Sequence, residues 1–217
     1  MNMAVARHNM IEQQIRPWEV LDERVLNLIE QTPREDFVPE GFTGLAYADV
    51  EIPLGEGQAM MAPRVEARLL QALAVKPTDT VLEVGTGSGY VTALLAKSAA
   101  RVHSVDIIPG FTALAKTRLA AVGLGNVTLE TGDAAAGWPE HGPYDVIAVT
   151  GSLPMGDKNF RKLLKSGGRL FAVTGTAPVM EASLVTRLGE NQFVEEALFE
   201  TVLAPLINAP APRRFDF

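Results

Sequence analysis

From residue 80 onward, short apolar runs alternate with segments whose apolar residues recur at helical spacing. The apolar runs cover 80–84, 101–106, 126–133, 144–151 and 169–175, and the helical segments cover 91–99, 111–122 and 159–168. Strands that alternate with helices in this way form a mostly parallel sheet through right-handed crossovers. The sequence therefore predicts an α/β fold with a doubly wound, mostly parallel sheet.

The segments on either side of this alternation have different patterns. Helical spacing predicts helices over 3–16 and 21–32, with Asp22 able to cap the second, and Pro63 opens another helix as a first-turn proline. Residues 183–206 predict a β-hairpin that turns at 188–191. We expect one domain, with an N-terminal extension over 1–62, a core over 63–206 and a tail over 207–217.

The composition excludes several classes of protein. The chain has 217 residues, of which 47% are hydrophobic, and a formal net charge of −7, which disfavours a general nucleic-acid binder. It has no cysteine, so disulfides, thiolate catalysis and zinc-thiolate sites are excluded, and we expect no metal site. The N-terminus lacks a signal-peptide core, and no apolar stretch is long enough to span a bilayer. We expect a cytoplasmic protein without a membrane partner.

A glycine-rich loop joins the first strand of the alternation to the next helix. It reads Gly85-Thr86-Gly87-Ser88-Gly89 and is preceded by Glu83. A dinucleotide fingerprint would need its third glycine where Tyr90 stands, and no Gly-Lys-Ser/Thr follows, which excludes a phosphate-binding loop. The pattern resembles motif I of the class I S-adenosylmethionine (SAM)-dependent methyltransferases. That resemblance implies a Rossmann-like core over 63–206 that binds SAM.

Acidic residues follow the next two strands. Asp106 ends one strand, where a carboxylate can accept both ribose hydroxyls, and Gly132-Asp133 ends the other, where a SAM enzyme contacts adenine. The carboxyl ends of parallel strands meet at one edge of the sheet, so these groups are expected to share a site with the glycine loop. The predicted cofactor-binding residues are Glu83, Gly85, Thr86, Gly87, Ser88, Gly89, Asp106, Ile107, Gly132, Asp133 and Ala134.

The longer pattern resembles the protein-L-isoaspartate O-methyltransferase family from about residue 9 to residue 206. The segments that carry the resemblance are NMIEQQIRP, LDERVL, PREDFVPE, AYADVEIPLGEGQ, VLEVGTGSGYVTALLA, HSVDIIP, GDAAAGWP, PYDVIAVT and LKSGGRL. The resemblance implies that SAM methylates the free α-carboxylate of an L-isoaspartyl residue in a damaged protein or peptide. The resulting ester would then collapse to a succinimide.

The substrate loop departs from the family pattern Gly-Gln-Thr-Ile-Ser-x-Pro. Ala59 replaces the threonine and Met61 replaces the serine, so both hydroxyls are lost. A carboxylate acceptor is already ionised at pH 7 and needs no general base, but it must be held in line with the methyl donor. Arg64 could replace the hydroxyls as a bidentate clamp. We therefore expect Met61, Arg64 and Thr150 at the reacting centre.

Three functions remain open at this point. The chain could be an isoaspartyl methyltransferase with a rearranged acceptor loop, a methyltransferase for another acceptor such as a small carboxylate or phenol, or a non-catalytic SAM-binding domain. The three histidines, His8, His103 and His141, are spread apart in the sequence. His103 alternates along a strand and is expected to be structural, and Trp18 and Trp138 are expected to pack. The oligomeric state and the place of the tail are not determined by the sequence.

Overall fold

The computed structural model describes residues 2–212 and contains a seven-stranded sheet with the order β5-β4-β3-β6-β7-β8-β9. The strands are β3 (Thr80–Val84), β4 (Arg101–Asp106), β5 (Val127–Thr131), β6 (Tyr144–Leu153), β7 (Leu164–Thr176), β8 (Val179–Gly189) and β9 (Gln192–Glu200). Strands β3 to β7 pair in parallel, and β8 and β9 are added antiparallel. The predicted α/β fold with a C-terminal hairpin is confirmed.

Helices cover the two faces of the sheet unequally. The helices α3 (Pro63–Leu73), α4 (Tyr90–Ser98) and α5 (Pro109–Ala121) contribute to one large core together with the N-terminal segments. The opposite core is smaller and is covered by α6 (Lys158–Arg161) and the loop between β5 and β6. Its buried members include Val105, Ala134, Tyr144 and Phe160. Loop residues 132–143 therefore cover this face of the sheet, where a helix would otherwise pack.

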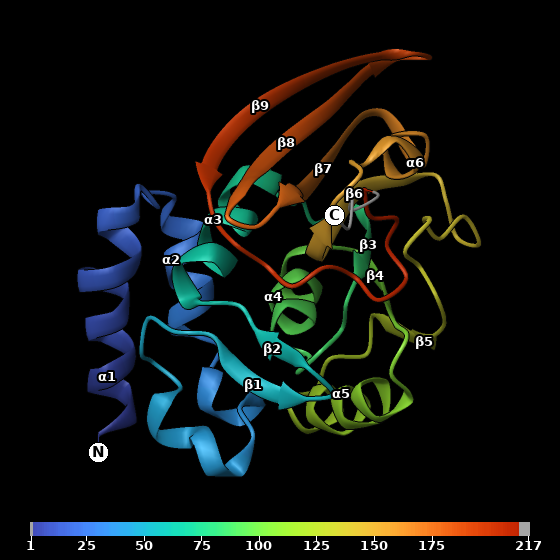
Figure 1. Cartoon of the computed structure of the whole chain (residues 1–217). Coiled ribbons are helices and arrows are strands. Elements are labelled where there is room, and N and C mark those ends of the chain that lie inside the picture. Colours follow the sequence, from blue (N-terminus) through green and yellow to red (C-terminus); the bar gives the residue numbers. More distant parts are fainter. Residues whose placement is uncertain (1, 213–217) are drawn as a thin grey trace, which may run out of the picture.

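The N-terminal segments wrap one side of the core (Figure 1). Helix α1 (Met3–Met10) continues through a π-helical turn (Ile11–Ile15) into a 3₁₀ turn (Arg16–Trp18), and α2 (Glu23–Glu30) follows. The Asp22 side chain accepts a hydrogen bond from the Arg24 backbone amide, as expected of a helix N-cap. Two 3₁₀ turns (Arg34–Phe37 and Glu40–Leu45) then lead to the short hairpin β1 (Ile52–Gly55) and β2 (Gln58–Met60).

Two predicted boundaries are wrong. The helix expected over 159–168 is a single turn that ends at Arg161, and Leu164 already pairs with Tyr144 as the first residue of β7. The hairpin expected over 183–206 runs instead from Val179 to Glu200. Leu164 is buried when it pairs in the sheet. This burial outweighs the local helical spacing, because a strand here adds Leu164 to the hydrophobic core.

The chain after β9 runs back across the carboxyl ends of the parallel strands (Figure 1). Pro205 forms an isolated parallel bridge with Ser152 at the end of β6. Of the predicted tail, residues 213–217 lie outside the described residues. Within residues 2–212, no helix combines the length and the apolar character needed to cross a membrane.

Candidate functional site

A cleft lies where the parallel strands end. It contains about 780 Å³ of space that protein atoms leave empty, part of it open to solvent. Its walls come from the β1–β2 hairpin region, the loops after β3, β4 and β5, the start of α5, the end of β6, and the segment after β9. The lining residues are Glu51, Leu54, Gln58, Ala59, Met61, Val84, Gly85, Gly87, Val105, Asp106, Ile107, Ile108, Phe111, Gly132, Asp133, Ala134, Ala135, Thr150, Gly151, Leu203, Ala204, Leu206 and Ile207.

The glycine loop forms the floor of the cleft. Gly85 has φ +101°, and a Cβ atom there would lie 2.2 Å from the Thr150 hydroxyl oxygen, so no side chain fits. Thr150 Oγ1 lies 2.7 Å from the Gly85 carbonyl oxygen and 3.0 Å from that of Val84. Because the hydroxyl has one proton to donate, the protein backbone already engages it. Thr150 thus holds the glycine loop in place, and its hydroxyl oxygen can accept a hydrogen bond from a ligand but cannot donate one.

Asp106 joins the glycine loop to the next strand. Its carboxylate accepts hydrogen bonds from the backbone amides of Gly87 and Ile108, each at 2.9 Å. The side chain is 7% exposed and lines the cleft, and burial raises the pKa of its carboxyl above the ordinary value. Asp106 therefore presents an oriented acceptor at the place where hydroxyl groups of a ribose were expected.

Glu83 lies beneath the glycine loop and does not line the cleft. Its Oε2 accepts hydrogen bonds from the hydroxyls of Thr92 and Ser104, each at 2.5 Å, while Oε1 has no hydrogen-bond partner among residues 2–212. Burial raises the pKa of Glu83 to about 8, and the nearby charge of Asp106 adds to the effect. Ser104 in turn shares a 2.7 Å hydrogen bond with Thr86 in the loop. Glu83 supports the loop from inside the protein.

The remaining loop residues face in other directions. Thr86 and Ser88 line a smaller adjoining pocket, between the loop and Met60 and Met61. Gly89 caps α4 with φ +84°, and a Cβ atom there would lie 3.0 Å from that of Ala115 in α5. The positive φ and the close approach of Ala115 both favour glycine at this position.

The far wall of the cleft is closed by the segment after β9. Ser152 donates through its backbone amide to the Ala204 carbonyl at 2.9 Å, and Leu206 donates to the Ser152 carbonyl at 3.0 Å. Asn208 Nδ2 then donates to Asp133 Oδ2 at 2.9 Å. This segment contributes four lining residues, Leu203, Ala204, Leu206 and Ile207. No local motif marks them, because a distant extended segment becomes a wall only when the chain folds back.

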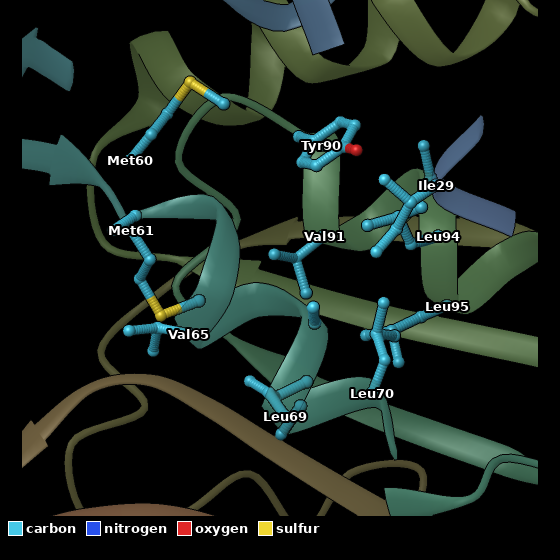
Figure 2. Close-up of a cluster of buried hydrophobic side chains, with 14 of the residues drawn as sticks. Ile29, Met60, Met61, Val65, Leu69, Leu70, Tyr90, Val91, Leu94 and Leu95 are labelled. Atoms are coloured by element: carbon cyan, nitrogen blue, oxygen red, sulfur yellow. The ribbon is translucent and has the colours of Figure 1, made fainter. Parts of the chain in front are cut away.

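The β1–β2 hairpin borders the opposite side of the cleft. Met60 and Met61 are 4% and 5% exposed, and Figure 2 shows the Met61 side chain ending beside Val65. Both methionines belong to the large core, and Met61 also lines the cleft. The cleft at this point therefore has an apolar wall in place of a hydroxyl.

Arg34 holds this hairpin in place and was not predicted from the sequence. It is fully buried, forms two hydrogen bonds to the Glu66 carboxylate at 3.1 and 3.2 Å, and donates to the carbonyls of Ala46 and Met61 at 2.9 and 2.7 Å. The paired charge satisfies the guanidinium, and the two carbonyls fix the chain before and after the hairpin. Burial of an arginine has no signature in the local sequence.

Arg64 lies outside the lining of the cleft. Its guanidinium forms an ion pair with Asp49 and lies over the Trp18 ring, with 4.6 Å from Cζ to the ring centroid. An arginine held by both a carboxylate and an aromatic face is not directed at an acceptor. Its expected function as a clamp stays a prediction, and the pairing with Asp49 counts against it.

Comparison with known proteins identifies the family. Residues 5–210 match the family model described as protein-L-isoaspartate(D-aspartate) O-methyltransferase. The chain belongs to this family. A protein-L-isoaspartate O-methyltransferase 2 of Pelobacter propionicus is 37% identical over 209 residues, which cover 96% of this chain and 93% of that protein. A protein-L-isoaspartate O-methyltransferase of Rhodopseudomonas palustris is 38% identical over 201 residues, or 92% of each chain.

Solved structures share the fold of this protein-L-isoaspartate O-methyltransferase family member. A Plasmodium falciparum protein described as a putative protein-L-isoaspartate O-methyltransferase in complex with S-adenosyl-L-homocysteine superimposes with a TM-score of 0.78 at 19% identity, covering 95% of this chain and 98% of that one. A second protein-L-isoaspartate O-methyltransferase also gives 0.78, at 24% identity, covering 92% of this chain and 65% of that one. Family membership makes the chain a SAM-dependent O-methyltransferase, as the resemblance implied.

The residues in the cleft fit a SAM-sized ligand. The volume suits a nucleoside with an amino-acid side arm, and the floor is bare backbone at Gly85 and Gly87. Asp106 offers a carboxylate for hydroxyl groups, and Phe111 and Ile107 offer apolar surface. In this methyltransferase the residues that would hold SAM are therefore those predicted ones that line the cleft: Gly85, Gly87, Asp106, Ile107, Gly132, Asp133 and Ala134.

Two histidines that are far apart in the sequence meet in the structure. The rings of His103 and His141 stack with centroids 4.1 Å apart and planes at 16°. The loop between β5 and β6 brings His141 back over β4. Trp138 in the same loop covers Gly132, where a Cβ atom would lie 2.6 Å from the indole ring, so it packs as expected.

Proposed function

We propose that this chain transfers the methyl group of SAM to the α-carboxylate of L-isoaspartyl residues in proteins or peptides. One observation carries the proposal: the glycine loop and Asp106 share a single cleft with Ala59 and Met61 of the hairpin region. A donor bound along the loop and an acceptor bound against the hairpin would meet in that cleft. The names of the relatives supply the substrate class.

The residues of the cleft act by binding and orientation. When bound, SAM supplies an electrophilic methyl group on a sulfonium centre. Asp106 and the loop glycines would fix the donor, while Leu203 to Ile207 would exclude water from above. The acceptor carboxylate is ionised at pH 7, so no residue has to remove a proton. Alignment of the two reactants then supplies most of the rate enhancement.

The acceptor side of the cleft differs from the family pattern. The side chains of Ala59 and Met61 cannot donate a hydrogen bond, and Thr150 directs its hydroxyl proton to the backbone. Glu51 adds a carboxylate to the lining, and burial raises the pKa of that carboxyl. These features favour a second function, in which the enzyme methylates a different acceptor, such as a small carboxylate or a phenol. A SAM-binding protein without catalytic activity is the third alternative.

Methyl transfer from labelled SAM to an isoaspartyl peptide, with the aspartyl version of the same peptide alongside, tests the proposal. Base-labile label on the isoaspartyl peptide alone would support it. SAM binding is measured separately by calorimetry. Binding without transfer to either peptide would overturn it, and a panel of small carboxylates and phenols would then separate a changed acceptor from a non-catalytic domain.

The other expectations about cellular context stay predictions. They are a cytoplasmic location and the absence of a nucleic-acid partner. Both derive from the N-terminal sequence and the net charge of −7.

A further inference from the structure

Three side chains from different elements converge beneath the loop between β5 and β6. His103 lies on β4, Glu130 on β5 and His141 on the loop, and one ligating atom of each lies within 4.8 Å of the others. His141 Nε2 is 2.9 Å from Glu130 Oε2. His103 is 5% exposed, and its Nδ1 is buried without a hydrogen-bond partner in the part of the chain that the structure describes. Buried polar atoms are normally hydrogen-bonded to protein or water or bound to an ion, so this ring nitrogen is available to a ligand.

We propose that His103, Glu130 and His141 form a binding site for a divalent transition metal ion of the Zn²⁺ type. Imidazole nitrogens and a carboxylate oxygen are the ligands that Zn²⁺ and its first-row neighbours accept. Two histidines and one glutamate make a three-ligand set that leaves a fourth position for water. The proposal concerns a different place from the cleft and does not depend on the methyl acceptor.

The stacked rings would have to rearrange to bind one ion together. A metal ion lies in the plane of each imidazole that binds it, so two rings at 16° to one another cannot share one ion. One ring must turn, and His141 can do so because it is exposed on a loop, whereas β4 holds His103. Metal binding therefore replaces the ring stack and the His141–Glu130 contact by bonds to the ion.

The position of the site links it to the cleft. Trp138 Nε1 donates to Glu130 Oε2 at 3.3 Å, and the Trp138 ring covers Gly132, which lines the cleft next to Asp133. A metal ion bound to Glu130 and His141 would tie this loop to β4 and β5. The site would thus stabilise the loop that borders the cleft, on the face of the sheet that has little helical cover.

Zn²⁺ binding to the untagged full chain, measured by equilibrium dialysis, tests the proposal. We expect one Zn²⁺ per chain, with affinity falling more than about 100-fold in His141→Ala and in Glu130→Gln, since loss of a ligand costs more than the roughly 10- to 100-fold loss seen for outer-shell partners. His8→Ala is the matched control, because His8 is exposed on α1 and is the one histidine outside the cluster. Unchanged circular dichroism of the metal-free variants shows that they fold. Absence of stoichiometric binding, or equal binding by wild type and His141→Ala, would overturn the proposal.

A spectroscopic test locates the ion independently. In a Trp18→Phe background Trp138 is the only tryptophan, and paramagnetic Co²⁺ at Glu130 should quench its fluorescence. The quenching should disappear in the His141→Ala variant. Quenching of equal strength with and without His141 would assign Co²⁺ to another group of carboxylates and would contradict the site.

Discussion

Asn208 Nδ2 donates a hydrogen bond to Asp133 Oδ2 at 2.9 Å, which ties the segment after β9 to the end of β5. The two residues are 75 positions apart in the chain, and Asp133 lines the cleft. The segment from Leu203 to Ile207, which precedes Asn208, forms the far wall. The Asn208–Asp133 bond therefore gives this wall a second anchor, beside the hydrogen bonds that Ser152 on β6 makes to the segment.

Replacing Asn208 should weaken cofactor binding. For Asn208→Ala we expect SAM affinity to fall about 2- to 10-fold, the range of one net hydrogen bond. Asn208→Asp should have the larger effect, because it places a like charge against Asp133. Calorimetric titration with SAM measures both. Equal affinities for the wild type and the aspartate variant would show that the segment does not need this bond.

Asp106 should contribute to cofactor binding through its charge. Asp106→Asn keeps the shape but weakens the acceptor for the Gly87 amide and for ligand hydroxyls. We expect SAM affinity to fall about 10- to 100-fold, the range for hydrogen bonds to a charged group. Thermal unfolding without ligand serves as the control, since a large loss of stability would mean that the variant acts through the fold instead.

Restoring one hydroxyl at the hairpin should favour an isoaspartyl acceptor. Ala59 is exposed, so Ala59→Thr fits without repacking, and we expect kcat/KM for an isoaspartyl peptide to rise about tenfold with SAM affinity unchanged. Ala59→Val has the same shape without the hydroxyl and is the matched control. A similar gain in both variants would assign the effect to apolar contact with the substrate.

Glu83 should make the protein less stable as the pH rises. Its pKa is about 8 in the folded protein against an ordinary value of 4.5, so between these values the folded state binds the extra proton. Its contribution to the free energy of unfolding then falls as the pH increases from about 4.5 to 8, by on the order of 5 kcal/mol. Glu83→Gln cannot titrate and should remove this part of the slope. Urea unfolding at pH 6 and pH 8.5 measures it, and parallel slopes for both proteins would contradict the assignment.

Local patterns in the sequence determined the fold class and the floor of the cleft. The alternation of apolar runs with helical spacing predicts the parallel sheet, and Gly85, Gly87 and Asp106 are adjacent to strand ends, so the sheet itself brings them together. These features are predictable because each follows from the short segment around it and from the rule that parallel strands end at the same edge of a sheet. The same reasoning failed at Leu164, where sheet pairing, a long-range interaction, outweighed the local helical spacing.

Only the tertiary structure decided which side chains face the cleft and which support it. Glu83 and Gly89 belong to the same motif as Gly85, yet one lies beneath the loop and the other packs against α5. Arg34, Asn208 and the stacked pair of His103 and His141 depend on contacts between residues far apart in the chain. Burial and hydrogen bonding of that kind arise when distant segments meet, so no local pattern in the sequence specifies them.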